Sequence, residues 1–465
     1  MSATLQTQSA SISLANTLRQ RRQRLAQQIE TPVILWSGSS SPRNFPANVF
    51  RFRASSHFLY LAGMPLENAA IHLDDGKLTL FMDDVTPASA LWHGEMPARK
   101  DIAQQLGADE ALPLEALESW VEGAATVAVQ DAVTHRQQCQ LLHRQVAPSH
   151  GSEGIDLALA QAIVSLRLSH DEAALNEIRQ AAAVSMVAHQ AGMATTLQVQ
   201  REAEVRAAME QVIMGHDMTC AYPSIATVQG EVLHNGHYHQ PIQPGDLFLA
   251  DVGAETPGGW ASDITRTWPV SGCFSASQRD LYQVVLAAHD RCIEQARPGV
   301  EFRELHLLAC SAIAQGLVDL GILRGHPDDL VDRDAHALFF PHGLGHLLGL
   351  DVHDMEDLGD LAGYAPGRHR SDRFGLGFLR LDRPLQVGMV VTIEPGFYQV
   401  PGILQDPERR ARYKDVVNWE RLAQFSDVRG IRIEDDVLIT EEGAEVLSAD
   451  LPTQPDAIEQ YMGSD

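Results

Sequence analysis

The first third of the chain alternates short β-forming runs with helical pieces. A basic, helix-like segment at 18–28 is followed by strand-like runs at 31–36, 57–63 and 77–84, each bounded by turn-forming residues. Strands and helices that alternate in this way are typical of a mixed α/β domain. We therefore expect the N-terminal part to form a small domain of that class.

The hydrophobic pattern changes after about residue 165. Residues 170–213 have the spacing of two long alanine-rich amphipathic helices, with acidic residues in the first turn of one of them. A change of pattern in a chain too long for one hydrophobic core indicates a domain boundary. We place the domains at 1–168 and 169–465.

The second domain contains pairs of strands with helices between them. Apolar strand runs lie at 245–255, 260–270, 389–398 and 430–440, and helical spacing marks 276–296 and 301–322. Strands that run in hairpins, with helices to one side, predict an α+β fold. The charged span 401–429 between two of the strands is expected to be a surface insertion.

Two acidic residues interrupt the first strand pair. A hairpin folding about Pro257 places Asp251 and Asp263 across from each other, since each lies six residues from that proline. Directly opposed Cβ atoms are about 4.5–5.5 Å apart, and a shifted register makes the pair diagonal at about 7–8 Å. In either arrangement two like charges face each other among apolar neighbours, which is unfavourable without a cation between them.

The second strand pair repeats this feature. Glu394 ends an apolar strand just before Pro-Gly, and Glu434 lies within another strand, two residues from Arg432 and so on the same face. Carboxylates in such apolar strands need compensation, which two divalent ions would supply. Oxygen-rich ligands favour hard cations such as Mn²⁺ over structural zinc.

A glycine-rich stretch, PHGLGHLLGLDVHD at 341–354, contains three histidines. Three glycines among seven residues disfavour a helix, because each costs about 1 kcal/mol there. The stretch is expected to be extended or looped backbone that packs closely. One of its histidines would complete a metal shell with the four carboxylates, and the others would face the substrate.

Composition restricts the class of protein further. The 465 residues are 45% hydrophobic and carry a formal net charge of −26, which argues against nucleic acid or an anionic membrane as partner. Five cysteines without a C-x-x-C pair indicate neither a disulfide framework nor a thiolate zinc site. A cytoplasmic location fits best. The first residues are rich in Ser, Thr and Arg, with no acid before Glu30, so an organelle transit peptide is the alternative to a frayed polar leader.

Five motifs occur in an order that is typical of one family. They are LHNG (233–236), DVG with SDITRTW (251–268), HGLGHLLGLDVHD (342–354), TIEPGFY (392–398) and GIRIEDD (430–436). This series resembles the proline-specific M24 metallopeptidases aminopeptidase P and prolidase, over about residues 170–445. RRQRLAQ near residue 21 and FRFRASSHFLYLAG at 50–63 are similar, less strongly, to the aminopeptidase P N-terminal domain. The resemblance implies a pita-bread catalytic domain.

The resemblance also implies the role of each matching residue. Asp263 and Glu434 would bridge two metal ions, Asp251 would complete the shell of one ion, and His346 with Glu394 that of the other. Glu394 would also shuttle a proton. The further roles fall to matching residues: His234, His342 and His353 would hold the substrate carbonyl, the proline and the tetrahedral intermediate, and Tyr398 and Arg432 would support the metal shell.

Three features of the chain depart from the family pattern or lie outside the motifs. Asp251 and Asp263 are one residue further apart than in many members, and the interval from Glu394 to Glu434 resembles the insertion of prolidase-like members. Trp92 would line a substrate pocket or reach a neighbouring subunit, with a packed domain-interface aromatic as the alternative.

The leading hypothesis is an Xaa-Pro aminopeptidase in which a hydroxide bridging two metal ions, most simply Mn²⁺ with Co²⁺ or Zn²⁺ as alternatives, attacks the carbonyl before proline. A prolidase, which cleaves only Xaa-Pro dipeptides, is second: the 401–429 insertion favours it, and the N-terminal domain favours the first. A metal-free binding relative is the third. A homodimer or homotetramer is expected from the two-domain resemblance.

Overall fold

The computed structural model describes residues 2–148 and 151–463 and forms two compact units. The first unit comprises Met1–Leu168 together with Met355–Ala362, and the second comprises Ser169–Asp354 and Gly363–Asp465. The sequence assigned 355–362 to the second domain, whereas the contacts of this segment group it with the first unit.

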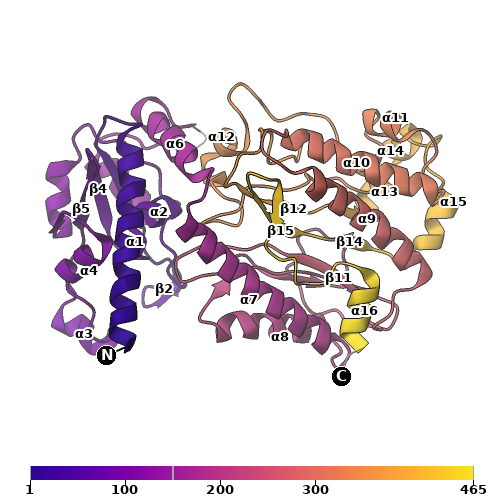
Figure 1. Cartoon of the computed structure of the whole chain (residues 1–465), viewed down its shortest axis with the longest axis horizontal. Coiled ribbons are helices and arrows are strands. Elements are labelled where there is room, and N and C mark those ends of the chain that lie inside the picture. The colour runs from indigo at the N-terminus through magenta and orange to yellow at the C-terminus, as the bar shows by residue number, and fades with distance from the viewer. Residues whose placement is uncertain (1, 149–150, 464–465) are drawn as a thin grey trace. The chain divides into compact units, whose positions relative to one another are not determined.

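A four-stranded sheet forms the centre of the first unit (Figure 1). Its order is β1-β4-β5-β6, with antiparallel pairs except for the parallel pair β5–β6. Ile34, Trp36 and Phe81 contribute to a buried cluster on the sheet. The strands are β1 (Val33–Trp36), β4 (Ala70–Asp74), β5 (Lys77–Phe81) and β6 (Glu110–Leu112), and β2 (Pro42–Phe45) pairs with β3 (Asn48–Val49).

Helices and the 3₁₀ segment η1 accompany these strands within the described part of residues 2–168. The long α1 begins well before the segment at 18–28 in which helix was expected. The elements are α1 (Ser2–Ala26), α2 (Ser56–Ala62), α3 (Pro87–His93), α4 (Arg99–Leu106), η1 (Leu114–Trp120), α5 (Ala132–Leu141) and α6 (Gly154–Arg167). No helix among the described residues combines the length and the hydropathy needed to cross a bilayer.

The run at 57–63 is helical, so its prediction as a strand is wrong. All residues of α2 are buried, and Gly63 ends the helix in the left-handed region, at φ 73°. A short apolar run without alternation suits a buried helix as well as a buried strand, and tertiary packing decides between them. Here the buried Arg22 guanidinium donates to the Leu61 carbonyl near the helix end, at 3.1 Å, where a cation suits the helix dipole.

A buried histidine holds the segment 355–362 in the first unit. Arg167 donates to His57 Nδ1 at 2.9 Å, and His57 Nε2 lies 2.9 Å from Asp357 Oδ2. Arginine has no acceptor, so His57 carries its proton on Nε2 and donates it to Asp357. Burial alone would raise the pKa of the Asp357 carboxyl, but the adjacent His57 and Arg167 outweigh burial and lower it.

We expect Asp357→Asn to destabilise this unit by about 1–3 kcal/mol at pH 7. A carboxyl with a depressed folded-state pKa contributes stability that is present above its unfolded pKa of about 3.9 and is lost as the pH falls. The difference between wild type and variant should therefore shrink below about pH 4. Amide hydrogen exchange in β4 and β5, measured from pH 3 to 7, tests this. The exposed Glu118→Gln provides the control, and a pH-independent difference would contradict the prediction.

Two helix pairs accompany the strands of the second unit. The pair α7 (Glu172–Thr196) and α8 (Glu202–Gly215) lies side by side, as does the pair α9 (Ala276–Gln295) and α10 (Phe302–Asp319) (Figure 1). All four helices fall where the hydrophobic spacing predicted helix. Outside the span 401–429, the other helical elements are short: α11 (Pro327–Asp332), η3 (His336–Leu338) and α16 (Pro455–Gly463) in the second unit, with η4 (Glu356–Leu358) and all but the last residue of α12 (Asp360–Gly363) in the first.

Short antiparallel strands carry the acidic motifs. Their sheet orders are β11-β9-β8, β12-β15-β16, β10-β7 and β13-β14. The strands are β7 (Thr219–Cys220), β8 (Ile225–Thr227), β9 (Leu247–Asp251), β10 (Ala254–Glu255), β11 (Thr265–Pro269), β12 (Val390–Ile393), β13 (Gly396–Tyr398), β14 (Gly430–Arg432), β15 (Asp435–Ile439) and β16 (Ala444–Val446).

The β9–β11 register makes the acidic pair diagonal. Asp251 pairs with Thr265, so the directly opposed arrangement with Asp263 is wrong and the shifted register holds. The hairpin is centred on Gly258, since Glu255 also bridges Ala261. This centre lies one residue beyond Pro257, and it moves the residue opposite Asp251 by two positions.

The span 401–429 folds into α13 (Pro401–Leu404), α14 (Pro407–Arg412), α15 (Trp419–Leu422) and η5 (Ala423–Phe425). Its exposed residues alternate with well-buried ones, among them Tyr413 at 1% and Phe425 at 2% exposure. The prediction of a mere surface insertion is therefore incomplete. The buried part of the span packs on the rest of the second unit, since Arg324 N donates to the Val416 carbonyl and Asn418 N to the Ile322 carbonyl, each at 2.8 Å.

Candidate metal centre and active site

One cavity of about 650 Å³ in the second unit collects residues from all five motifs. The sequence-predicted residues that line it are His234, Asp251, Asp263, His342, His346, His353, Glu394, Arg432 and Glu434. They come from segments far apart in the chain, and only the folding of the strands brings them together.

The acidic residues and His346 form overlapping groups of potential metal ligands. One ligand atom from each of Asp251, Asp263 and Glu434 lies within 4.8 Å of the others. The same holds for His346, Glu394 and Glu434. Glu434 belongs to both groups, as expected of a ligand shared by two ions. It lies in the break between β14 and β15, so its predicted place inside a continuous strand is wrong.

A third group adds a residue that was not expected as a ligand. His353 joins Asp263 and His346 within the same 4.8 Å limit, and its ring centroid lies 4.3 Å from that of His346. One of its nitrogen atoms is therefore within 4.8 Å of an oxygen of the Asp263 carboxylate. This position suits contact with a substrate oxygen bound at the same place.

Asp251 shows one clear sign of a missing partner. Its Oδ2 accepts from Arg432 Nη2 at 2.5 Å, while its buried Oδ1 has no hydrogen-bond partner among the described residues. A buried carboxylate oxygen without a donor is costly unless a cation contacts it. The free oxygen belongs to a residue of the three-carboxylate group, as a metal ligand requires.

The orientation of His346 gives independent support. Its Nδ1 lies 3.0 Å from the Leu347 carbonyl and must donate to it, since a carbonyl only accepts. Nε2 lies 3.3 Å from Asp263 Oδ2 and 3.7 Å from Glu394 Oε1. With Nδ1 as the donor, Nε2 can offer a lone pair to a metal ion that the two carboxylates also bind.

The close packing of acids affects their protonation. Burial raises the pKa of Asp263 and of Glu434 well above the usual range, and the neighbouring carboxylates raise both further. Burial also raises the pKa of Glu394 to about 7, although His346 and Arg432 oppose it. Without cations the protein would therefore hold several of these groups protonated near neutral pH.

These observations fit two divalent ions. Four carboxylates and one imidazole provide an oxygen-rich set of ligands, of the kind that hard divalent cations prefer. Asp251, Asp263 and Glu434 would hold one ion, and His346, Glu394 and Glu434 the other. Asp263 has an oxygen within reach of both groups.

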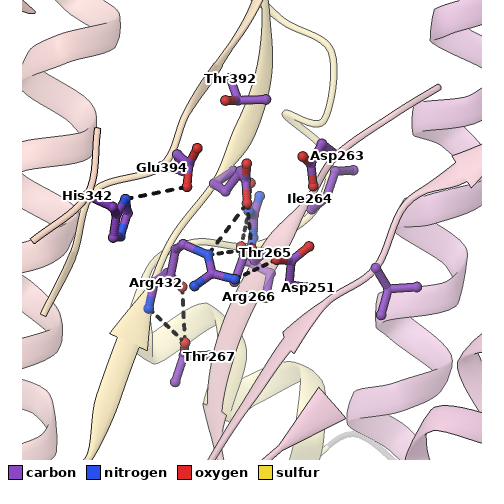
Figure 2. A network of polar contacts seen from close by, with 12 residues as sticks. Asp251, Asp263, Ile264, Thr265, Arg266, Thr267, His342, Thr392, Glu394 and Arg432 are labelled. Carbon is purple, nitrogen blue, oxygen red and sulfur yellow. Dashed lines mark hydrogen bonds and ion pairs between the residues drawn. The ribbon is translucent and has the colours of Figure 1, made fainter. Parts of the chain in front are cut away.

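Arg432 orients two of these carboxylates through hydrogen bonds. Its Nη2 donates to Asp251, its Nε donates to Thr265 Oγ1 at 3.1 Å, and Thr265 in turn donates to Glu434 Oε2 at 2.6 Å. Figure 2 shows the guanidinium reaching toward Asp251, and a further contact that joins His342 to Glu394. One buried cation thus orients two of the carboxylates.

A chain of hydrogen bonds continues from Arg432 to His342, which lines the cavity. Arg432 Nη1 donates to Tyr398 Oη at 3.1 Å, and Tyr398 Oη donates to His342 Nε2 at 2.8 Å. His342 Nδ1 donates to the Gly343 carbonyl at 2.8 Å. Burial and the nearby Arg432 lower the pKa of His342 to about 3, so this imidazole is neutral and its orientation is fixed.

The glycine-rich stretch is looped backbone, as predicted. Gly345 lies against β12, where a Cβ would meet the Thr392 carbonyl oxygen at 1.9 Å, so a larger residue does not fit. His346 N donates to Thr392 Oγ1 at 3.1 Å, and Thr392 N donates to the His346 carbonyl at 3.0 Å. Close packing of this loop on a strand fixes the position of the His346 imidazole.

Trp92 is placed differently from the other predicted residues. It lies on α3 of the first unit, and 80% of its surface is exposed within that unit's surroundings as described. Its neighbour Leu91 is 79% exposed. Its predicted role in substrate binding or at a neighbouring subunit stays a prediction.

Several residues near the centre were missed. Tyr222 donates to Asp263 Oδ1 at 2.5 Å, and Arg370 and Arg380 line the cavity. Thr265 was detectable, since it follows Asp263 by two residues and so shares its strand face. Tyr222 and the arginines stand outside the motifs, and no spacing signal marks them.

A buried ion pair fixes the strands that carry the ligands. Arg266, fully buried, donates to the Glu434 carbonyl at 2.7 Å and to Asp435 Oδ1 at 2.6 Å. Asp436 accepts from the Asp263 amide at 3.1 Å. These contacts join the β9–β11 hairpin to the β14–β15 segment, and so set the positions of Asp263 and Glu434.

Comparison with known families agrees with this geometry. The model of metallopeptidase family M24 matches residues 176–441, which is more than half of the chain, and that of the aminopeptidase P N-terminal domain matches residues 18–131. The chain belongs to metallopeptidase family M24. It is accordingly a metal-dependent peptidase with the aminopeptidase P type of domain organisation.

Similar proteins fall into two named groups. A probable Xaa-Pro aminopeptidase of Fusarium vanettenii is 31% identical over 428 residues, covering 88% of this chain and 86% of its own. The human Xaa-Pro dipeptidase is also 31% identical, over 466 residues. The match covers 95% of this chain and 90% of the dipeptidase.

Solved structures support the fold assignment. Aminopeptidase PepP of Pseudomonas aeruginosa is similar with a TM-score of 0.79 and 28% identity, covering 96% of this chain and 98% of its own. Aminopeptidase P from E. coli with the inhibitor Pro-Leu is similar with a TM-score of 0.78 and 27% identity. The match covers 96% of this chain and 98% of that structure's chain. The expected pita-bread catalytic domain with a smaller N-terminal domain is confirmed.

Proposed function

We propose that the protein is an Xaa-Pro aminopeptidase, which releases the first residue from peptides that have proline in second position. The convergence of Asp251, Asp263, His346, Glu394 and Glu434 in one cavity carries this proposal. The names of relatives on the aminopeptidase side support it.

Two bound divalent ions would activate a water molecule near neutral pH and polarise the substrate carbonyl. The residues of the chain do the rest. Glu394 accepts the proton of the attacking water and delivers it to the proline nitrogen as the C–N bond breaks. His353 or His234 donates a hydrogen bond to the developing oxyanion. An Xaa-Pro bond has no N–H that could bind the substrate, so contacts with the proline ring have to replace that hydrogen bond. His342, which Tyr398 holds in place, would face the ring.

Manganese is the metal we propose. Oxygen donors predominate among the five residues, which favours a hard cation, with Co²⁺ and Zn²⁺ as the other candidates. We also propose a homodimer or homotetramer, in which the exposed Leu91 and Trp92 are covered by another subunit, and a cytoplasmic location. Metal analysis of purified protein and sedimentation test the first two points.

Peptide hydrolysis tests the activity. Xaa-Pro-Yaa tripeptides should be cleaved after the first residue, a chelator should abolish cleavage, and Mn²⁺ should restore it. Cleavage of Xaa-Pro dipeptides alone would reject the proposal in favour of a dipeptidase. Absence of both cleavage and bound metal after manganese supplementation would indicate a non-catalytic relative.

The dipeptidase is the second candidate, and a specific observation favours it. Arg370 and Arg380 line the cavity, and Arg380 is near enough to His234 to contribute to lowering its pKa, after burial and Arg432. A dipeptide carries its free carboxylate on the proline itself, where a guanidinium pairs with it strongly. Val400 and Ile403, at the start of the span 401–429, line the same cavity.

We expect Arg380→Met to separate the two candidates. Loss of a charge-assisted hydrogen bond costs about 1.5–3 kcal/mol, so the KM for an Xaa-Pro dipeptide should rise about 10- to 100-fold if Arg380 binds the terminal carboxylate. The KM for a tripeptide amide should stay nearly unchanged. Arg409→Met, in the span 401–429 but outside the cavity, is the control. Equal effects on both substrates would contradict a carboxylate-binding role.

A further inference from the structure

The β9–β11 hairpin departs from regular pairing beside its two metal-ligand candidates. Val252 N still donates to the Ile264 carbonyl at 3.1 Å. The reciprocal hydrogen bond of this pair, from Ile264 N to the Val252 carbonyl, is not made among the described residues. One backbone hydrogen bond instead of two therefore joins the strands where the carboxylates converge.

A histidine on a helix forms hydrogen bonds to both strands at this point. His189 on α7 is fully buried, and its Nε2 lies 3.2 Å from the Val252 carbonyl and 3.0 Å from the Ile264 carbonyl. Both partners only accept, so Nε2 carries the proton and donates to both strands at once. Burial, with Arg266 adding to it, lowers the pKa of His189 to about 4, and the ring is neutral.

The two carbonyls directly follow the two ligands in the chain. Val252 follows Asp251, and Ile264 follows Asp263, so the shared donor spans the positions from which both carboxylates project. Both carboxylates belong to one group of acidic side chains within 4.8 Å, and like charges at that separation repel each other. A donor shared by both strands opposes their separation.

We propose that His189 is a positioning residue for the dinuclear centre, which fixes the separation of Asp251 and Asp263 through its shared hydrogen bond to the carbonyls of Val252 and Ile264. The inference rests on the proposed metal-dependent function. In this proposal His189, which lies outside the five motifs, controls the affinity of Asp251 and Asp263 for a metal ion.

Two amide substitutions at this position test the role. His189→Gln places an N–H donor the same number of bonds from Cβ as Nε2, whereas the amide of His189→Asn is one bond shorter and falls short of the carbonyls. Mn²⁺ binding to metal-stripped protein is measured by calorimetric titration, which does not depend on activity. We expect His189→Asn to bind one of its two ions about tenfold more weakly than wild type, and His189→Gln to stay within about threefold.

Thr196→Val is the matched control on the same helix. It removes another buried hydrogen bond, from Trp268 Nε1 to Thr196 Oγ1 at 2.9 Å, but away from the carboxylates. Its melting temperature should fall while both manganese affinities stay unchanged. An equal loss of affinity in this control would mean that His189 acts only through general stability, and would overturn the proposal.

The remaining outcomes are also decisive. Wild-type affinity in His189→Asn, or equal weakening in the Asn and Gln variants, would overturn the positioning role while two ions bound to wild type uphold the metal centre. Wild type that binds no manganese would instead reject the metal centre itself, and the inference with it.

Discussion

Glu434→Gln is expected to lower kcat/KM for Xaa-Pro-Yaa peptides by about 1,000-fold or more, the equivalent of about 4 kcal/mol. Glu434 is shared by two groups of potential ligands, so its loss weakens both metal sites together. Manganese content after gel filtration should fall below that of the wild type. The exposed Glu445→Gln on β16, which loses a surface contact with Arg179, should behave as wild type.

The same substitution should have the opposite effect on the stability of metal-free protein. The folded-state pKa of Glu434 is raised by burial and by Asp263, so its ionisation opposes folding. The metal-free wild type therefore loses stability as the pH rises above the unfolded pKa of about 4.3, and the glutamine variant avoids this part of the loss. In a chelator at pH 8 the variant should melt at a higher temperature than wild type, and with Mn²⁺ the order should reverse.

Two results would contradict this account. If the variant melted below wild type in the chelator at pH 8, the carboxylates would not be in electrostatic conflict. If it retained full activity and metal content, Glu434 would not be a shared ligand. Melting curves at pH 5 and pH 8, each with and without manganese, distinguish the cases.

The second large effect is expected for Glu394→Gln, which should reduce kcat by about 100- to 10,000-fold at saturating Mn²⁺. Glutamine keeps the shape of the side chain and one oxygen, but it does not accept the proton from water. The reduction should therefore fall on kcat more than on KM. Steady-state kinetics with a tripeptide, with metal content measured in parallel, test this.

Glu231→Gln is the matched control for Glu394. Glu231 lines the same cavity, but it pairs with Arg429 instead of joining the metal-ligand groups. Its substitution should change kcat by less than about tenfold. Equal losses in the two variants would mean that negative charge in the cavity, and not proton transfer by Glu394, supports the reaction.

Local patterns predicted much of the catalytic unit. The spacing of apolar residues predicted the four long helices. The acidic residues in apolar strands indicated the metal-ligand candidates, because a buried charge without a compensating partner strongly destabilises the fold. The same rules failed at 57–63, where a short apolar run formed α2. They also failed at Glu434, which lies between two strands rather than within one.

By itself, the sequence determined the chemical nature of the centre: which carboxylates and which imidazole are present, and hence the preference for hard cations. The tertiary structure alone decided the β9–β11 register, the tie from His189, and the presence of Tyr222, Arg370 and Arg380 near the site. The reason is physical. Side-chain chemistry is a property of each residue, whereas the separation of two carboxylates depends on hydrogen bonds between segments that are distant in the chain.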